Sequence, residues 1–437
     1  MCANTRSSIS GCTNASNIGP RADHLINNPR RSTLMSRREK IIFTWLTVTF
    51  CLFFAGLLIF DRRPRLLNVL DIVFFAPAFI YAVRFHSRDF SGFLKRNFWL
   101  ILFLFFASCS TFFASEPNPS RFFRAFFHIL TLFAFVQAIL RTHETIFWRS
   151  LLIGILFGAL VAMIDFYCYY FVVDRPFTDQ LYGKYETFHI NKLITLSTNQ
   201  LHASMYFVTL PFFAFFAASR LPQSVTVRLA PYAASVMIAI YLIANQRRST
   251  LVALFVGSLV LPVLTLRKKL VVPVLAMIVV IVAILLVNPE MITDRGSSSR
   301  FAIWTETWHS IAERPVLGHG MAGEMPDIHI VSSDGKPAVF SHPHNYYLSL
   351  LYYLGVAGLV LWTLIWFPSA LHSLSHRDTA HWPLAALATG LTAVFFDGVH
   401  PFTPFMYNWP SVWIPMALLV GFRYIKPGLP PHATENT

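Results

Sequence analysis

The sequence predicts an all-α protein that crosses a membrane many times. Of its 437 residues, 55% are hydrophobic and only 13% are charged, whereas a soluble domain is usually about 25% charged. Apolar runs of roughly 20 residues, each long enough to cross a bilayer as a helix, recur along the whole chain. They do not show the alternating hydrophobicity of membrane-barrel strands. These observations predict a polytopic bundle of transmembrane helices.

About twelve spans are predicted, each an apolar run between charged or proline- and glycine-containing breaks. Their ranges are 41–60, 66–85, 98–114, 122–140, 147–171, 200–219, 227–245, 250–266, 269–288, 345–366, 382–398 and 407–424. Together they form one membrane domain over residues 41–424. A polar tail of residues 1–40 precedes this domain, and a short tail of residues 425–437 follows it.

The distribution of charge predicts which side of the membrane each loop faces. Because the number of spans is even, both termini lie on one side, and the majority of the 35 Lys and Arg residues fall on that side. Lys and Arg collect in cytoplasmic loops, so both termini are predicted to be cytoplasmic. The net charge of +14 is then explained by membrane orientation rather than by binding to nucleic acid. The two long loops, residues 172–199 and 289–344, are predicted to face the outer side.

The second long loop contains a predicted helix that lies at the membrane surface. Four apolar residues recur there at helical spacing, and they are Phe301, Trp304, Trp308 and Ile311. Tryptophan is enriched at the membrane–water interface, which suits an amphipathic helix in that plane. Pro315 ends the helix, because proline disfavours helical backbone at the residue before it. Gly318 and Gly320 then allow a tight turn.

Three groups of polar residues at the outer edge of the membrane are candidates for chemistry. Arg247 and Arg248 join two spans almost without a loop. They either snorkel to lipid headgroups or bind a phosphate through paired N–H donors. Arg300 opens the amphipathic helix, and it is either a surface residue or a second arm of such an anion clamp. His342 and His344 are structural residues or, since neutral imidazole accepts a proton, a general base.

Other charged residues are weaker candidates. Asp71 and Asp165 lie in predicted spans, where a carboxylate suggests function by default. Arg121 flanks a short outer loop, and we retain it as a candidate substrate-binding residue rather than a catalytic one. Asp397 lies near the last outer loop and is predicted to be structural. No spacing of His, Cys, Asp or Glu typical of a metal site is evident, so neither a metal nor a cofactor is predicted.

The outer-edge residues occur in motifs that resemble those of bacterial O-antigen ligases. His344-Asn345, nine residues and then Gly355-Val356-Ala357-Gly358 is similar to the family's HN-x9-GxxG signature. Upstream, the run from Arg300 to Gly320 is similar to the outer-loop pattern of the same superfamily, in the form R-F-x-x-W, then I-x-x-x-P-x-x-G-x-G. The resemblance covers residues from about 200 to 366, and the remainder of the chain fits by hydropathy.

One departure from the family pattern concerns the membrane-edge arginine. Arg248 followed by Ser249 resembles that motif, but the family's serine often precedes the arginine, and Arg247 occupies that place here. Either arginine is therefore open as the clamp, with Arg248 preferred by position. His342 is similarly an alternative to His344, although the nine-residue spacing selects His344.

The resemblance implies a fold like that of C-type membrane glycosyltransferases. It also implies glycosyl transfer at the periplasmic face of the bacterial inner membrane, without metal or nucleotide. The donor would be a glycan on undecaprenyl pyrophosphate, and the acceptor would be a sugar of lipid A–core. Arg248 and Arg300 would stabilise the pyrophosphate leaving group, and His344 would take the proton of the attacking hydroxyl.

The resemblance also suggests substrate-binding residues around this catalytic set. Arg247 would add a phosphate contact, and Asn345 would orient His344. Trp304 and His342 would line the substrate site, beside membrane lipids that hold the polyprenyl tail.

Two alternative functions remain open from the sequence. An O-antigen polymerase of the same superfamily would use a second lipid-linked glycan as its acceptor. A transporter of polyprenyl-linked glycans would carry charged residues deep in its spans, whereas the charges here gather at the outer edge. A protein O-oligosaccharyltransferase is less favoured, because those enzymes usually carry a longer soluble C-terminal part.

Overall fold

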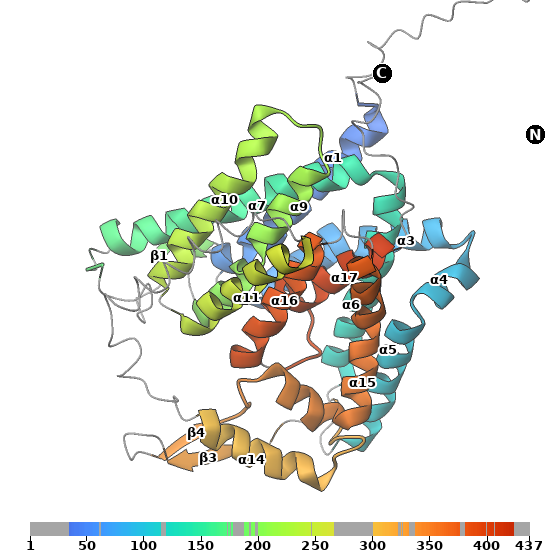
Figure 1. Cartoon of the computed structure of the whole chain (residues 1–437), viewed down its shortest axis with the longest axis vertical. Coiled ribbons are helices and arrows are strands. Elements are labelled where there is room, and N and C mark those ends of the chain that lie inside the picture. The colour runs from blue at the N-terminus through green and yellow to red at the C-terminus, as the bar shows by residue number, and fades with distance from the viewer. Residues whose placement is uncertain are drawn as a thin grey trace, which may run out of the picture.

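The computed structural model of the protein is mostly helical (Figure 1). The residues that it describes are 35–60, 63–114, 119–172, 174, 176–177, 188–191, 194–196, 200–245, 247–265, 300–321, 325, 327–331, 337–375, 381–398, 400–405 and 407–423.

Long helices make up most of the bundle, and short helical turns and two hairpins complete it. The α-helices are α1 (Arg37–Ile59), α2 (Arg63–Leu70), α3 (Ala76–His86), α4 (Phe90–Arg96), α5 (Phe98–Ser110), α6 (Pro119–Thr142), α7 (Glu144–Tyr167), α8 (Gln200–Phe207), α9 (Leu210–Ser219), α10 (Val225–Ala244), α11 (Arg248–Thr265), α14 (Arg300–Glu313), α15 (Tyr346–Ser375), α16 (His381–Asp397) and α17 (Ile414–Arg423). The short turns are η1 (Asp71–Phe75), η2 (Thr111–Phe113), η3 (Cys168–Val172) and η5 (Trp409–Trp413). The antiparallel hairpins pair β1 (Phe188–Asn191) with β2 (Ile194–Leu196), and β3 (Ile328–Val331) with β4 (Pro337–Phe340).

The helices agree with the predicted multispan architecture as far as the described residues reach. Helix occupies every predicted span except 269–288, which lies outside the described residues. Among the described residues, six helices are long and apolar enough to cross a membrane, or up to seven if a bent pair is one span. A polytopic helical membrane protein is therefore confirmed, while the number of twelve spans stays a prediction.

Three local features differ from the sequence predictions or extend them. Helix α1 begins at Arg37, inside the predicted tail, because Ser36 and Glu39 form a reciprocal capping box. The rest of the N-terminal tail and the C-terminal tail lie outside the described residues. Both long loops contain a short hairpin that was not predicted, since strands of three or four residues give too brief an alternation to recognise.

Two glycines bring α1 and α7 into close contact. A Cβ on Gly154 would overlap Phe50, and a Cβ on Gly158 would lie 2.8 Å from Phe54 Cβ. Small residues four apart on one helix face let two membrane helices approach closely without a side chain between them. Phenylalanine fills the space beside this contact, where Phe53 meets Phe405 at a ring-centroid distance of 4.4 Å.

An elbow between α4 and α5 is fixed by a buried pair of amides. The two helices bend by 77° at Asn97. The Asn97 side chain donates to Gln137 Oε1 at 3.2 Å, and Gln137 Nε2 donates back to Asn97 Oδ1 at 2.7 Å. Buried polar groups are costly unless they are paired, so this reciprocal bond holds the elbow against α6.

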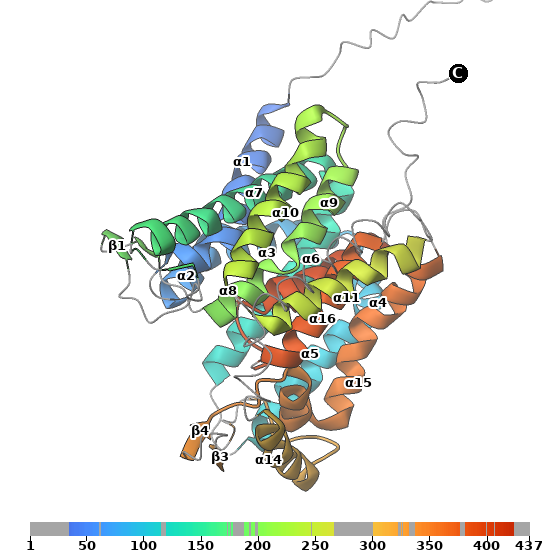
Figure 2. The ribbon, with the colours of Figure 1, turned by 60° about the vertical axis from the view of Figure 1, so that its left-hand side comes forward.

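Helices α11 and α16 lie side by side and antiparallel (Figures 1 and 2). Gly257 leaves no room for a Cβ against Thr389 Oγ1, which fixes the register of the pair. Eight residues toward one end, the same register brings Ser249 against Asp397, and their side chains are hydrogen-bonded at 2.9 Å. The packing of two apolar helices therefore sets the position of a buried carboxylate.

The outer-loop glycines interlock with a break in α15. Gly355 has a φ of +61° and interrupts the helical backbone of α15. At this break the N–H of Val356 donates to Pro315 O at 2.9 Å, and the N–H of Gly320 donates to Tyr353 O at 2.9 Å. The segment after α14 is thus bound through its backbone to α15, and the two glycine motifs of the sequence are halves of one contact. Figures 1 and 2 show α14 and the β3–β4 hairpin at the same end of the molecule as the start of α15.

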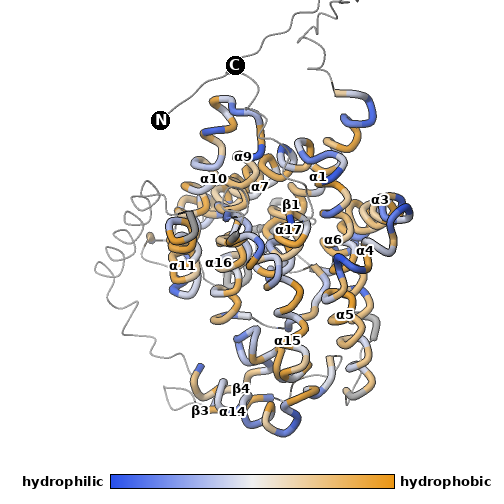
Figure 3. The backbone as a smooth tube through the Cα atoms, turned by 45° about the vertical axis from the view of Figure 1, so that its right-hand side comes forward, coloured by the Kyte–Doolittle hydropathy of each residue, from blue (hydrophilic) through white to orange (hydrophobic). Residues whose placement is uncertain are grey.

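The hydropathy of the backbone follows this arrangement. Figure 3 shows hydrophobic residues along most of the bundle helices and hydrophilic residues near α14 and near the turn between α3 and α4. Polar residues thus gather around α14 and at the α3–α4 turn, while the bundle helices are mostly apolar, as suits a bilayer.

We expect Gly355→Ala to lower the thermal stability of the protein. An alanine would have to adopt a positive φ with an extended ψ, a region essentially restricted to glycine that costs about 1–3 kcal/mol, and its Cβ would overlap the Val316 carbonyl group. The measurement is the unfolding midpoint in detergent. Gly421→Ala is the matched control, since a Cβ there meets only side chains, the nearest at 3.0 Å. Equal midpoints for the two variants would contradict the interlock.

Candidate functional site

A buried carboxylate joins three helices at the end of the bundle where α14 lies. Arg300 Nη2 donates to Asp397 Oδ1 at 2.8 Å, and Ser249 Oγ donates to Asp397 Oδ2 at 2.9 Å. The Asp397 side chain is 3% exposed and that of Arg300 is 29% exposed. The positive charge of Arg247 also stabilises the Asp397 carboxylate. Asp397 thus brings the arginine segment that begins α11 together with the arginine that begins α14.

Helix α14 also binds the turn that carries the two histidines. Trp304 Nε1 donates to Pro343 O at 3.0 Å, and the Trp304 ring contacts Phe395 on α16 at a centroid distance of 5.5 Å. Trp304 lies one helical turn after Arg300, and side chains four residues apart share one face of a helix, with Cβ atoms about 5–6 Å apart. The Arg300–Asp397 pair and the histidine turn are therefore neighbours along one face of α14.

Some side chains of the predicted apolar stripe of α14 are buried in the protein, and others are exposed. Ile311 is buried and Trp304 is half-buried, whereas Phe301 is 69% exposed and Trp308 is 56% exposed. The predicted helix is confirmed, and it ends at Glu313, directly before the Arg314-Pro315 break. Its two exposed aromatic side chains fit the predicted position at a membrane surface, which stays a prediction.

The two histidines pack against each other in a strained turn. Their ring centroids are 4.0 Å apart, and the ring of Phe340 lies 5.8 Å from His344. His344 has a φ of +51°, which is uncommon for a residue with a side chain. Strain of this kind is often found where a side chain must be held in one orientation for function. Burial lowers the pKa of His342, so its ring is neutral near pH 7.

Asn345 acts as the cap of α15. Its side-chain oxygen accepts hydrogen bonds from Tyr347 N at 2.9 Å and Leu348 N at 3.1 Å, and the residue is buried. This is the usual bond of an asparagine before the first turn of a helix. The asparagine of the HN motif therefore fixes the start of α15 directly after His344. Its predicted role in orienting the His344 side chain stays a prediction.

Three helix N-termini are brought together by these contacts. They belong to α11, α14 and α15, and each end of an α-helix carries a partial positive charge of about half a unit. The backbone of Arg247 supplies the first carbonyl of α11, accepting from Thr250 N at 3.2 Å. With the nearby arginines, the combined field favours an anion at this end of the bundle.

The structure adds Asp397 to the candidate site residues, and it does not describe the side chain of the predicted residue Arg121. Sequence reasoning assigned Asp397 a structural part, yet it is the group that connects Arg300 to the segment beginning α11. The available signal was a carboxylate at the end of an apolar span, which must find a partner. Arg121 lies in the first turn of α6, and its side chain lies outside the described ones.

The intramembrane carboxylates singled out by the sequence are both bound to partners. Asp71 accepts from Arg124 Nη2 at 2.5 Å and pairs with His128 Nε2 at 2.6 Å. The backbone N–H of Phe405 donates to the other ring nitrogen of His128, which assigns the Nε2 proton to the bond with Asp71. Asp165 is fully buried and accepts from Tyr241 at 3.1 Å. Among the described residues, no three His, Cys, Asp or Glu side chains are grouped as metal ligands would be.

The lowered pKa of His342 predicts a pH dependence of stability. Its ordinary pKa is 6.5, so below that pH the unfolded chain binds a proton that the folded protein resists. The contribution of neutral His342 to the free energy of unfolding is complete above about pH 6.5 and is lost as the pH falls. We expect His342→Gln to reduce the fall in unfolding midpoint between about pH 7.5 and pH 5.5. His309→Gln, at an exposed site on α14, is the control and keeps the full fall. If the unfolding midpoint of His342→Gln fell as much as that of the wild-type protein, the burial of His342 would not contribute to this pH dependence.

Known proteins are similar to the part of the chain that builds this site. Residues 233–363 match the family model described as O-antigen ligase. The chain is also 36% identical over 184 residues to a protein of Pseudomonas aeruginosa named O-antigen ligase, and this match covers 41% of the chain and 44% of that protein. The chain thus spans less than half the length of this relative. The matched region includes Arg248, Arg300, His344 and the Gly355 break, whereas Asp397 lies beyond the family match. The part of the chain that builds this site is therefore similar to the O-antigen ligase family.

Proposed function

We propose that the protein transfers O-antigen polysaccharide from undecaprenyl pyrophosphate to lipid A–core at the periplasmic face of the bacterial inner membrane. One observation carries this proposal. A single face of α14 connects the Arg300–Asp397–Ser249 network, through Trp304, to the turn that holds His344. This connection supports a site in which cationic groups bind a pyrophosphate and a nearby base acts on a hydroxyl.

The arginines suit the leaving group of this reaction. As the bond between the anomeric carbon and the phosphate oxygen breaks, its electron pair passes to the pyrophosphate. Fixed cationic donors aimed at that developing charge lower the barrier. In the proposed site Arg248 and Arg300 bind these oxygens, and Arg247 adds a further contact. Asp397 limits the motion of Arg300, so that less rotamer freedom is lost when the substrate binds.

His344 suits the acceptor side of the reaction. The acceptor hydroxyl attacks the anomeric carbon, and its proton passes to the imidazole of His344. Attack from the face opposite the leaving group inverts the anomeric configuration. The left-handed backbone at His344 and the cap at Asn345 fix the position of the base. His342 and Trp304 line the substrate site next to it.

The proposed orientation places this chemistry at the periplasmic surface. Lys and Arg favour the cytoplasmic side of membrane proteins, which supports cytoplasmic termini. The exposed Phe301 and Trp308 of α14 then lie at the outer interface, where a polyprenyl carrier presents its pyrophosphate. The carrier tail would lie between apolar helices in the bilayer.

The experiment uses purified protein in liposomes with an undecaprenyl-pyrophosphate glycan and lipid A–core, with products identified by mass spectrometry. We expect His344→Ala to slow transfer about 10²–10⁴-fold, because a general base is lost. Arg248→Lys and Arg300→Lys each keep the charge but lose the paired donors, and we expect a loss of about 10²-fold. Arg314→Lys, at an exposed site after α14, is the matched control and retains the rate.

Two outcomes would contradict the proposal. Longer glycans that remain on undecaprenyl pyrophosphate would identify a polymerase, whose acceptor is a second lipid-linked chain. Near-normal transfer by His344→Ala, with the unfolding midpoint unchanged, would remove His344 as the base.

A further inference from the structure

A large cavity lies at the opposite end of the bundle from the candidate site. Its volume is about 1160 Å³, and it is lined by α1, α3, the turn into α4 and the last turn of α6. Helix α15 begins at the histidine turn and reaches a second, smaller cavity at Leu364 and Ser369. Beyond the break at Gly355 the helix rises 1.5 Å per residue, so the part of α15 from Gly355 to Ser369 extends roughly 20 Å. The two cavities share Arg96 in their walls.

The larger cavity is strongly cationic. Its lining includes five arginines, which are Arg38, Arg84, Arg88, Arg96 and Arg141. Asp89 is the one acidic residue in the lining, and it pairs with Arg96 at 2.9 Å. Glu39, on the neighbouring turn of α1, is bound to Ser36. Among the residues that the structure describes, none forms a hydrogen bond or an ion pair with the side chain of Arg38, Arg84 or Arg88. Positive charge therefore exceeds negative charge in this wall.

The same cavity has an apolar wall that continues along the membrane-facing part of α3. Ile42, Trp45 and Pro77 line it beside Ile80, whose side chain is 65% exposed. The ring N–H of Trp45 is bound to Val73 O at 2.7 Å, so the ring presents its apolar faces. A cationic rim above an apolar wall is complementary to a molecule with an anionic head and a hydrocarbon tail. A small soluble anion would use only the rim.

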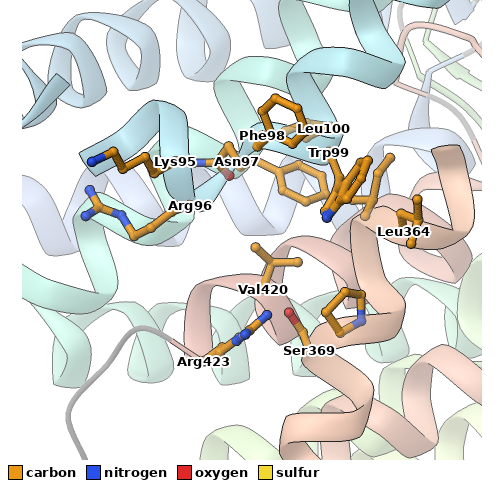
Figure 4. A pocket seen from close by; sticks show the side chains of 13 residues that line it. Lys95, Arg96, Asn97, Phe98, Trp99, Leu100, Leu364, Ser369, Val420 and Arg423 are labelled. Carbon is orange, nitrogen blue, oxygen red and sulfur yellow. The ribbon is translucent and has the colours of Figure 1, made fainter. Parts of the chain in front are cut away.

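The smaller cavity repeats this combination of charge and apolar surface. Figure 4 shows Lys95 and Arg96 at the end of α4, Trp99 near Leu364, and Arg423 and Ser369 across the cavity from them. Its volume is about 460 Å³, and no acidic residue lines it. Both sides of the α4–α5 elbow thus offer cations next to apolar side chains.

We propose that the larger cavity is a binding site for an anionic phospholipid of the cytoplasmic leaflet. Arg38, Arg84 and Arg88 bind the phosphate, and the acyl chains lie along Trp45 and Ile80. Basic pockets between membrane helices on the cytoplasmic side are well suited to acidic headgroups. The proposal rests on the predicted orientation of the chain and is independent of the transfer reaction at the other face.

The test is lipid binding to the purified full chain, measured by native mass spectrometry. We expect phosphatidylglycerol to bind more tightly than zwitterionic phosphatidylcholine of the same chain length. Because each arginine near a headgroup contributes about fivefold, the variant Arg84→Gln/Arg88→Gln should bind phosphatidylglycerol about 25-fold more weakly. The control Arg149→Gln/Arg228→Gln removes two exposed arginines on the same predicted side but outside the cavity, and it retains wild-type affinity.

Soluble anions distinguish a lipid from a phosphate alone. Inorganic phosphate and glycerol phosphate should compete weakly, because they cannot use the apolar wall. Competition by either anion as strong as that of phosphatidylglycerol would make the cavity a soluble-anion site and overturn the proposal. Equal binding of the two phospholipids, or unchanged binding by Arg84→Gln/Arg88→Gln, would also overturn it. Glycan transfer is not the readout, so failure here and failure of the proposed reaction are separate results.

Discussion

The site depends first on the ion pair between Arg300 and Asp397. A carboxylate that is 3% exposed at the end of an apolar helix is costly unless it is paired and hydrogen-bonded. Arg300 supplies the opposite charge, and Ser249 occupies the second oxygen. Removing one member of a buried pair typically costs about 3–5 kcal/mol, and less here because Arg300 is partly exposed. The need to satisfy one carboxylate thus holds α11, α14 and α16 in a fixed relation, and it sets the positions of Arg300 and of the segment that begins α11.

The backbone interlock between the outer loop and α15 is the second constraint. Gly318, Gly320 and Gly355 all have positive φ, and each lies where another backbone passes too close for a side chain. Two patterns far apart in the sequence are therefore explained by one contact. Once it forms, the cap at Asn345 and the bond from Trp304 to Pro343 set the place of the histidine turn. The strained backbone of His344 is maintained by this surrounding structure.

Much of this could be predicted from local patterns, and the remainder depends on contacts that no local pattern contains. Apolar length predicted the membrane helices, and the spacing of Trp304 and Ile311 predicted α14. The two partners of Asp397 could not be found in this way, because Ser249 and Arg300 are distant from it in sequence. Ser249 meets Asp397 only through the register of α11 against α16, and Arg300 meets it only through the placement of α14. The HN motif suggested that Asn345 orients His344, and the structure adds that the Asn345 side chain caps α15. The short hairpins also escaped prediction, since too few residues alternate.

The two ends of the bundle carry different sets of charged residues. One end gathers arginine, histidine and three helix N-termini around a buried carboxylate, and the other presents arginines above an apolar wall. The central claim is that Arg300 and Asp397 act as a unit in the site. A double-mutant cycle with Arg300→Gln and Asp397→Asn, measured as kcat/KM for glycan transfer, tests it most directly. The account predicts a coupling free energy of about 1–3 kcal/mol, with the double variant little slower than the slower single variant. Independent effects that multiply in the double variant would contradict it.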